Sequence, residues 1–340
     1  MKPAATQPAV GSRPVSRTPD VARAPGASQA PEVGFGKRLL GSLHFTGVFW
    51  YKLLNFGVRV VPDWAIATII AIFTGFFALA LQKVGRALGS NLEPVLGPCG
   101  WWRRQRRKLR TFWTFAWCLA ERYECFATDR PLESTLEGRQ HWDDALASGR
   151  GVLLVTAHIG HWETGALGAS TRIDRPVHVV REEESDPKSQ EFTQRLFDEK
   201  LGGQVTMHFV GDPMLGMKML AALRRGEIVA VQGDRPRTGG RTHRAEIFGR
   251  PIELPVGPAA LARSAGVPML PVFIFRTGRL STTSVFAPAI QLEPGPAPES
   301  LGRAVEILAQ EIEGAIRRAP HQWFCFRELW PKGRKISRRD

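Results

Sequence analysis

The amino-acid sequence predicts an α/β fold with a largely parallel sheet flanked by helices, preceded by an apolar, membrane-associated helical region. Three observations lead to this prediction. From about residue 131 onward, short runs rich in Val, Ile or Phe alternate with helical patterns, which is typical of an α/β domain. The runs are continuously apolar, as expected for strands of a sheet that is covered on both faces. Before them, residues 35–130 are apolar, aromatic and basic together.

The composition divides the chain into three parts. Residues 1–34 are rich in Pro, Ala, Gly and Ser and have no apolar period, so a disordered tail is expected there. This segment also lacks the apolar core of a signal peptide. Residues 35–130 form the helical region, and residues 131–340 form the α/β domain.

The helical region contains an uncharged stretch, residues 64–81, at the lower edge of the length that spans a bilayer. A spanning helix and an interfacial or re-entrant helix both fit it, and a buried helix of a soluble protein is a third alternative. Tryptophans beside a run of Arg and Lys follow at 101–117, as in the headgroup zone of a membrane. A solvated basic helix with two core tryptophans is the alternative there. If residues 64–81 span, the basic residues after them predict a cytoplasmic α/β domain.

The α/β domain is expected to contain strands at 151–157, 177–180, 205–210, 228–232 and 269–275. Between and after these runs, helical patterns cover residues 188–201, 214–225, 258–265 and 301–317. The last of them shows its apolar residues on one stripe of a helix: Leu301, Val305, Leu308, Ile312 and Ile316. No internal repeat is visible.

The charge and the cysteines narrow the class of protein. The chain has 46 Lys and Arg against 32 Asp and Glu, a net charge of +14 that suggests an anionic partner. Nucleic acid, acidic phospholipid and an acidic carrier protein all satisfy that description. The four cysteines are scattered and form no CxxC pair, so neither a metal cluster nor a disulfide framework is expected, and a reducing compartment fits best.

The segment most informative about chemistry is residues 156–163, TAHIGHWE. It begins where the apolar run 151–157 ends, and ligands of α/β sheets bind outside the carboxyl ends of strands. His158 and Glu163 are too far apart in sequence to share one helix face. Their spacing fits a His at a strand end and a carboxylate in the first turn of a helix from 163 to about 170, with Gly160 allowing a tight turn. We expect Glu163 to hold one imidazole nitrogen while the other acts as a general base.

Other interpretations of the same segment remain. A structural histidine at a strand end is common. A metal site of His158, His161 and Glu163 is an alternative, but HxxHxE is not a known zinc-protease spacing and no nearby Cys or third His supports it. No metal is therefore expected. A serine hydrolase is disfavoured because the chain contains no GxSxG motif.

Residues 158–163 resemble the HxxxxE/D box of the lysophospholipid acyltransferase superfamily, and most closely its bacterial lipid A late acyltransferase (lauroyl/myristoyl transferase) branch. Further blocks of that branch have similar counterparts in the same order, at residues 179–181, 223–236, 247–262 and 267–273. The likeness runs from about residue 45 to 330. Two features depart from the branch: His161 stands where Asn is usual, and residues 322–331 differ from the basic ending of lipid A enzymes. Both leave the acceptor open.

The resemblance implies an O-acyltransferase that moves a fatty acyl chain from acyl-carrier protein or acyl-CoA to a hydroxyl of a glycolipid or lysophospholipid, as in lipid A biosynthesis. His158 would be the general base and Glu163 its orienter, with no metal or redox cofactor. The implied location is the bacterial inner membrane, with the catalytic domain on the cytoplasmic side. Acyl chain length, the choice of donor and the oligomeric state stay open.

The candidate substrate-binding residues are Arg181, Asp234, Arg235 and Gly257. The planar guanidinium of Arg181 suits a phosphate of the acceptor or of pantetheine, although an ion pair with Glu182 or Glu184 explains it equally well. Asp234 and Arg235 follow the run 228–232, where an ordinary turn is the alternative. Gly257 starts a helix whose first amides can hold an anion, and a simple helix start is the alternative.

Two other function classes compete. A nucleic-acid binder would explain the charge, but the basic cluster lies beside tryptophans and an apolar segment, and no nucleic-acid recognition fold is visible. No nucleic-acid partner is therefore expected. A catalytically inactive lipid-binding or membrane scaffold protein is the other alternative, and only an activity measurement separates it from an enzyme.

Overall fold

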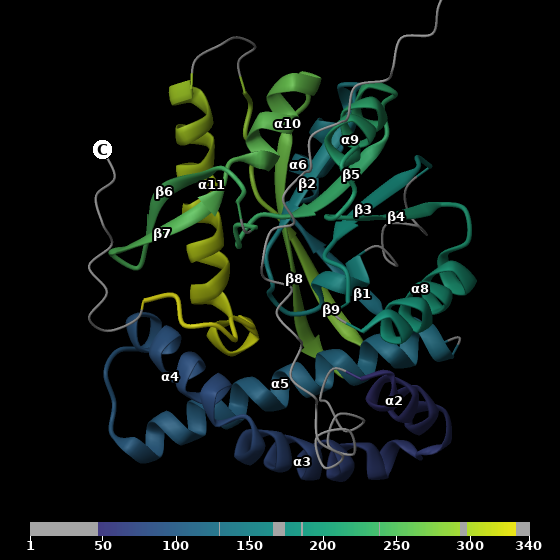
Figure 1. Ribbon diagram of the computed structural model, residues 1–340, viewed down its shortest axis with the longest axis vertical. Helices are drawn as coiled ribbons and strands as arrows, with labels where there is room; N and C mark the ends of the chain where they lie inside the picture. Colours follow the sequence, from purple (N-terminus) through teal and green to yellow (C-terminus); the bar gives the residue numbers. More distant parts are fainter. Residues whose placement is uncertain are drawn as a thin grey trace, which may run out of the picture. The chain divides into compact units, whose positions relative to one another are not determined.

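A seven-stranded sheet, in the order β1-β9-β8-β2-β5-β3-β4, lies at the centre of the α/β part of the protein (Figure 1). The structure is a computed structural model and describes residues 47–128, 130–165, 174–184, 186–237, 239–292 and 298–330. The tail expected at residues 1–34 lies outside the described residues. So does most of the helix expected from residue 163 to about 170, of which the structure describes a short 3-10 helix, η1 (Trp162–Thr164).

Most of the sheet is parallel. The parallel strands are β2 (Val152–Thr156), β3 (Val177–Arg181), β4 (Val205–Phe209), β5 (Ile228–Gln232) and β8 (Met269–Gly278). They coincide with the five apolar runs of the sequence, so the predicted α/β fold with a largely parallel sheet is confirmed. Strand β9 (Ser281–Phe286) is antiparallel to β8, and β1 (Glu133–Glu137) pairs parallel to β9. The sequence did not predict these two strands, because Ser, Thr and Glu make up much of both.

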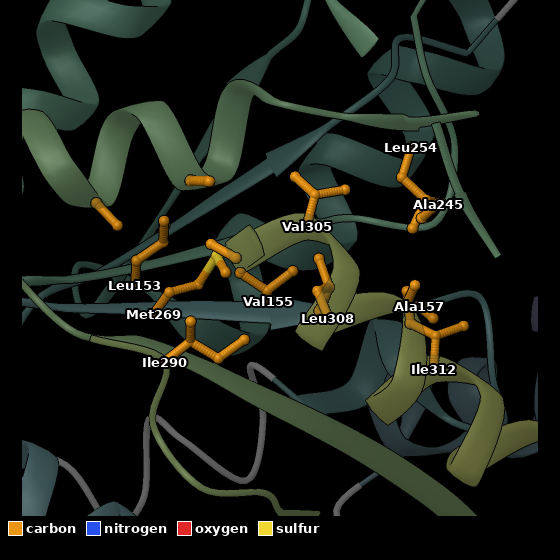
Figure 2. Packing of buried hydrophobic residues seen from close by; sticks show 14 of the residues in the cluster. Leu153, Val155, Ala157, Ala245, Leu254, Met269, Ile290, Val305, Leu308 and Ile312 are labelled. Atoms are coloured by element: carbon orange, nitrogen blue, oxygen red, sulfur yellow. The ribbon is translucent and has the colours of Figure 1, made fainter. Parts of the chain in front are cut away.

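Helices α9 (Leu215–Arg224), α10 (Gly257–Ala265) and α11 (Pro298–Arg318) cover one face of the sheet with a large apolar cluster. Figure 2 shows Leu153 and Val155 of β2 with Val305, Leu308 and Ile312 of α11 in this cluster. The apolar stripe predicted for residues 301–317 is thus the buried side of α11. A hairpin of β6 (Thr242–Ile247) and β7 (Arg250–Pro255) packs against α11.

The other face of the sheet is covered differently along its length. Helix α6 (Arg139–Ala147) covers the amino-terminal half of the strands, where Ala145 is buried with Val152, Ile228 and Leu270. Toward the carboxyl ends, α8 (Pro187–Leu201) contributes Phe197 and Leu201, which are buried together with Phe126. The carboxyl ends of β2, β3 and β5 border this part of the face. Side chains that directly follow these strands therefore lie next to it.

Helices α2 (Val48–Val60), α3 (Asp63–Ala80) and α4 (Gln82–Leu96) precede the sheet and pack against the long helix α5 (Trp101–Ala127) (Figure 1). Ile66 and Ile70 of α3 are buried against Trp117 and Ala120 of α5. Within the described residues, α3 is the one helix long and apolar enough to cross a membrane, with a mean hydropathy of 1.8 and 17% of it buried.

The exposed sides of α2 and α3 are largely apolar. The exposed large side chains lie mainly on α2, α3 and the start of α5: Phe49, Leu53, Phe56, Val60, Trp64, Ile72, Phe76, Leu79, Trp101, Trp102 and Leu109. On α3 they lie opposite the face that packs on α5, since Ile72, Phe76 and Leu79 follow the i, i+4, i+7 spacing of one helix side. A soluble monomer seldom exposes so extended a set of apolar side chains.

Candidate active site

His158 and Asp234 meet because their strands are neighbours. In the parallel register of β2 and β5, Thr156 lies opposite Gln232. The chain leaves both strands at the same edge, so the residues two positions further along become adjacent. Ala157 and Ile159, on either side of His158, are fully buried, which fixes the backbone while the His158 side chain keeps 18% exposure.

The Asp234 carboxylate holds the His158 ring through one nitrogen. Nδ1 of His158 lies 2.8 Å from Oδ1 and 3.1 Å from Oδ2 of Asp234, and the His158 backbone N–H donates to Oδ2 at 3.2 Å. Burial raises the pKa of Asp234, but the charge of His158 and its hydrogen bonds, together with Arg235, outweigh burial and lower that pKa to about 2. The carboxylate is therefore ionised, and Nε2 of His158 has no hydrogen-bond partner among the described residues.

The expected pairing of Glu163 with His158 is not what the structure shows. Glu163 forms an ion pair with Arg122 of α5, and Arg181 lies 3.8 Å from its other oxygen. Asp234, which the sequence suggested only for substrate binding, takes the place beside the imidazole. The physical reason is that the turn after His158 leads Glu163 toward α5, whereas the neighbouring strand places Asp234 directly against the ring.

The carboxylates and guanidinium groups around Glu163 form a continuous cluster. Arg181 Nη2 donates to Glu184 at 2.8 Å, and the Tyr51 hydroxyl of α2 donates to the same carboxylate at 3.3 Å. Burial, reinforced by Glu184, raises the pKa of Tyr51 to about 12. Arg122 is itself buried and has a guanidinium 4.9 Å from the Tyr123 ring centre. The ion pair of Arg181 with Glu184, left open by the sequence, is therefore present.

Gly160 and His161 build the turn between His158 and Glu163. Gly160 has a φ of +56°, and a Cβ there would lie 2.1 Å from the Ile274 carbonyl oxygen, so only glycine fits. His161 is buried, with Nε2 2.8 Å from Glu121, and Arg276 donates to the same carboxylate at 2.8 and 2.9 Å. This buried cluster attaches the turn to α5 and β8. His161 is therefore a structural residue rather than a partner of His158.

The segment after α11 closes the other side of the site. The Phe324 N–H donates to the His158 carbonyl at 2.9 Å, and Arg235 Nη2 donates to the Phe324 carbonyl at 2.6 Å. The Trp162 ring centre lies 5.3 Å from that of His158 and 5.7 Å from that of Phe324. Arg235 thus holds protein backbone, and its Nε lies 3.6 Å from Asp234.

A cavity of about 430 Å³ lies beside this site, against the carboxyl-terminal half of the sheet face that α6 leaves uncovered. On β2 and β8 alternate residues line it, which is the spacing of one sheet face: Leu154, Thr156, Val272 and Ile274. Residues 179–181 of β3 and 230–232 of β5 also line it. Trp162 and Glu163 line it as well. The volume is in the range of a site for one small ligand, and most of its wall is apolar.

Two other predicted features have a plainer role. Gly257 begins α10, whose buried residues belong to the cluster on the opposite face of the sheet, and it does not line the cavity. Among the described residues, no group of three or more His, Cys, Asp and Glu side chains is arranged to hold a metal ion. His158, His161 and Glu163 each have a different partner instead.

Arg122, Trp162 and the cavity were not predicted from the sequence. Arg122 lies after the basic start of α5, between Glu121 and Tyr123, and no motif in the sequence connects it with residue 163. Asp234 was found, but with another role. The signal that was available is that 151–157 and 228–232 are both central apolar runs, because polar residues at the carboxyl ends of adjacent parallel strands meet.

Comparison with known proteins places the chain in a family. Residues 35–332 match the family described as bacterial lipid A biosynthesis acyltransferase. The phosphatidylinositol mannoside acyltransferases of two Mycobacterium tuberculosis strains, CDC 1551 and H37Rv, are 29% identical over 214 residues, or 62% of this chain. The chain matches 64% of the length of these relatives, slightly less than two thirds.

Among solved structures, the 1-acyl-sn-glycerophosphate acyltransferase PlsC from Thermotoga maritima is similar with a TM-score of 0.34 and 14% identity. That likeness covers 73% of this chain and 96% of PlsC, and its TM-score is too low to add to the assignment. The family match covers most of the sequence and confirms the resemblance carried by residues 158–163 and the blocks that follow. This protein therefore belongs to the bacterial lipid A biosynthesis acyltransferase family.

Proposed function

We propose that this lipid acyltransferase transfers a fatty acyl chain from acyl-carrier protein or acyl-CoA to a hydroxyl of a membrane glycolipid or lysophospholipid, with His158 as the general base. The observation that carries the proposal is the hydrogen bond between Asp234 and Nδ1 of His158. It leaves Nε2 as the ring nitrogen with a free lone pair, beside an apolar cavity. This is the arrangement that general-base activation of a hydroxyl requires.

The reaction then proceeds by addition and elimination. Nε2 of His158 takes the proton of the acceptor hydroxyl as its oxygen attacks the thioester carbonyl. The resulting imidazolium is stabilised by the ionised Asp234. The tetrahedral intermediate collapses with cleavage of the carbon–sulfur bond, and His158 returns the proton to the departing thiolate. The products are an ester and a free thiol, and neither a metal nor a redox cofactor takes part.

Glu163 acts in this proposal through Arg122 and Arg181 rather than through His158. It lies at the edge of the cavity and holds two guanidinium groups there. Arg181 also lines the cavity and remains the candidate for a phosphate of the acceptor or of pantetheine. Asp234 is a positioning residue. Arg235 positions the Phe324 backbone, and Gly257 has no part in the proposal.

The cavity is proposed to hold the acyl chain. Its sheet-side wall consists largely of Leu, Val, Ala and Ile, and Trp162 connects it to His158. Its other boundary includes Phe197 of α8 and Trp142 of α6. A glycolipid acceptor is supported by the relatives named phosphatidylinositol mannoside acyltransferase. A lysophospholipid remains the second acceptor class.

The protein is proposed to lie on the cytoplasmic side of the bacterial inner membrane, with α2, α3 and the start of α5 in the interface. Their exposed apolar side chains include Trp64, Trp101 and Trp102, and indole rings favour the headgroup zone. The exposed Arg103, Arg106 and Arg110 lie on the same part of α5, where anionic lipids attract them.

An interfacial position of α3 is favoured over a spanning one because both of its ends are attached to the rest of the protein. At its start, Asp63 accepts two hydrogen bonds from Arg130, at 2.6 and 2.7 Å. Beyond its end, Asn91 of α4 donates to the Cys325 and Arg327 carbonyls at 3.0 and 2.7 Å. Placing these ends on opposite sides of a bilayer would separate them.

The test is acyl transfer by the purified protein in vesicles of phosphatidylethanolamine and phosphatidylglycerol. Labelled palmitoyl-CoA and palmitoyl acyl-carrier protein serve as donors, and a phosphatidylinositol mannoside and a lysophosphatidic acid serve as acceptors. We expect an ester product from one acceptor, and a loss of about 10²–10⁴-fold in rate for His158→Ala. Chelator should leave the rate unchanged. A wild type without transfer to either acceptor from either donor would instead identify a lipid-binding scaffold.

A further inference from the structure

The cavity has a polar end and an apolar end. At the carboxyl ends of the strands, toward His158, its wall includes Thr156, Arg181 and Gln232. Toward the amino-terminal half of the strands, its wall is formed by Leu154 and Val177. A carbonyl that reacts at His158 therefore has polar groups near it, and the chain behind it runs into the apolar end.

Trp142 stands at that apolar end. It is a residue of α6, the helix that covers the amino-terminal half of the same sheet face. Its ring centre lies 5.4 Å from that of Phe286 of β9, and both rings line the cavity. Behind them the face is closely packed, because Ala145, Val152 and Leu270 are buried there. The indole ring thus forms the boundary between the open cavity and a filled core.

We infer that Trp142 sets the longest acyl chain that the enzyme transfers efficiently. The inference rests on the proposed function, since it takes the cavity as the acyl-chain site. An acyl chain that extends from His158 toward α6 meets the indole ring before it reaches Ala145, Val152 or Leu270, which belong to the core and do not line the cavity. Chains that end at the ring fill the cavity, and longer chains must bend or leave methylene groups in water.

The size of the effect follows from the burial of methylene groups. Each buried methylene favours binding by about fourfold, so two further methylenes that fit once the ring is removed favour a longer donor by about fifteenfold. Trp142→Ala removes the ring and lengthens the cavity toward Ala145 and Leu146. Ala230→Leu does the opposite, because Ala230 lines the cavity from β5 and a larger side chain there fills it.

The experiment measures initial rates with lauroyl-, myristoyl-, palmitoyl-, stearoyl- and arachidoyl-CoA in the same vesicles. For Trp142→Ala we expect the rate with the donor two carbons longer than the wild-type optimum, divided by the rate with the optimum itself, to rise about fifteenfold. For Ala230→Leu we expect the optimum to move to a shorter chain. Trp142→Leu, a milder truncation, serves as the second variant if Trp142→Ala does not fold.

Trp330→Ala is the matched control, since it removes an indole ring that packs near Trp323 and Arg250 and does not line the cavity. It should leave the chain-length profile unchanged. Equal losses of rate for all donors in Trp142→Ala, Trp142→Leu and Ala230→Leu would overturn the inference while leaving the proposed function intact. Absence of transfer by the wild type with every acyl-CoA and with palmitoyl acyl-carrier protein would overturn the proposed function itself, so the two failures are distinguishable.

Discussion

At the scale of single residues, the contact between Asp234 and Nδ1 of His158 decides which ring nitrogen is available for chemistry. A carboxylate that accepts from Nδ1–H keeps the lone pair on Nε2 and stabilises the imidazolium that forms during proton transfer. The pKa of Asp234 is lowered to about 2, so this carboxylate is ionised at neutral pH. We therefore expect the pH dependence of the rate near neutrality to originate from a group other than Asp234.

Replacing Asp234 by Asn should lower the rate by about 10²–10⁴-fold, because the amide lacks the charge and favours the wrong tautomer of His158. Initial rates in the vesicle assay measure this. Asp198→Asn, an exposed position on α8, is the matched control and should keep the wild-type rate. The double variant His158→Ala/Asp234→Asn should be scarcely slower than His158→Ala alone, since His158 and Asp234 act as one unit.

A different pair of results would show that Glu163, and not Asp234, orients His158. It would consist of a wild-type rate in Asp234→Asn together with a rate in Glu163→Gln as low as in His158→Ala. On the geometry described above, Glu163→Gln should instead retain a measurable rate, because the ring of His158 keeps its carboxylate.

The ion pair of Arg122 and Glu163 makes a separate prediction about stability. The side chain of Arg122 is 9% exposed, so Glu163→Leu leaves a buried cation without its partner. Such a change costs about 3 kcal/mol, whereas the double variant Arg122→Met/Glu163→Leu should recover most of the loss. Unfolding by urea in detergent micelles measures both. The exposed pair Arg139–Asp143 is the control, and breaking it should change little.

At the scale of elements, α3 has two apolar sides, one against the protein and one exposed. One side of α3 packs on α5 through Ile66 and Ile70, and the other side exposes Trp64, 82% accessible, with Ile72 and Phe76. Burial against α5 on one side and the lipid contact proposed above on the other would together explain a helix that is hydrophobic all round yet only 17% buried.

Ile72→Glu/Phe76→Glu should reduce the partition of the protein into vesicles by at least about tenfold. Two apolar side chains that would insert into the membrane are lost, and two charges must be desolvated. Sedimentation with vesicles measures the bound fraction. Met214→Glu/Met217→Glu, two exposed apolar residues near α9, is the matched control and should sediment like the wild type. Equal loss in both variants would mean that charge alone, and not this surface, weakens binding.

The orientation of α3 is tested by labelling its two ends. In a Cys99→Ser background, single cysteines at Pro62 and Gln82 should react with a membrane-impermeant maleimide from the same side of inside-out vesicles. Labelling of the two positions from opposite sides would show that α3 spans the bilayer, and the interfacial arrangement would then be wrong.

At the scale of the whole molecule, the two faces of the sheet are used differently. Parallel strands are covered on both faces as a rule, and here α9, α10 and α11 cover one face fully. On the other face, α6 covers the amino-terminal half and a cavity of about 430 Å³ adjoins the rest. The helical region holding α5 lies beside this open end, since Cys125 of α5 lines the cavity. Helices α2 to α5 and the site are therefore parts of one continuous unit.

Helices and strands that have a clear pattern in a short stretch of residues could be predicted from the sequence. The five parallel strands were predicted because each is a short run rich in Val, Ile or Phe, and α11 because Leu308, Ile312 and Ile316 repeat at helical spacing. The position of His158 at a strand end and the need for glycine at position 160 could also be inferred from local order. Strands β1 and β9 were missed because Ser, Thr and Glu make up much of both, so neither is an apolar run.

The partners of the site residues could be identified only from the three-dimensional structure. Asp234 lies 76 positions after His158, and Arg122 lies 41 positions before Glu163, so neither pairing leaves a trace in local spacing. Strand register brings Asp234 to the imidazole, and the packing of α5 brings Arg122 to Glu163. Local periodicity predicts helices and strands because it depends on residues that are close in sequence. The pairing of site residues depends instead on which strand lies beside which. That strand order is established only when the whole sheet assembles.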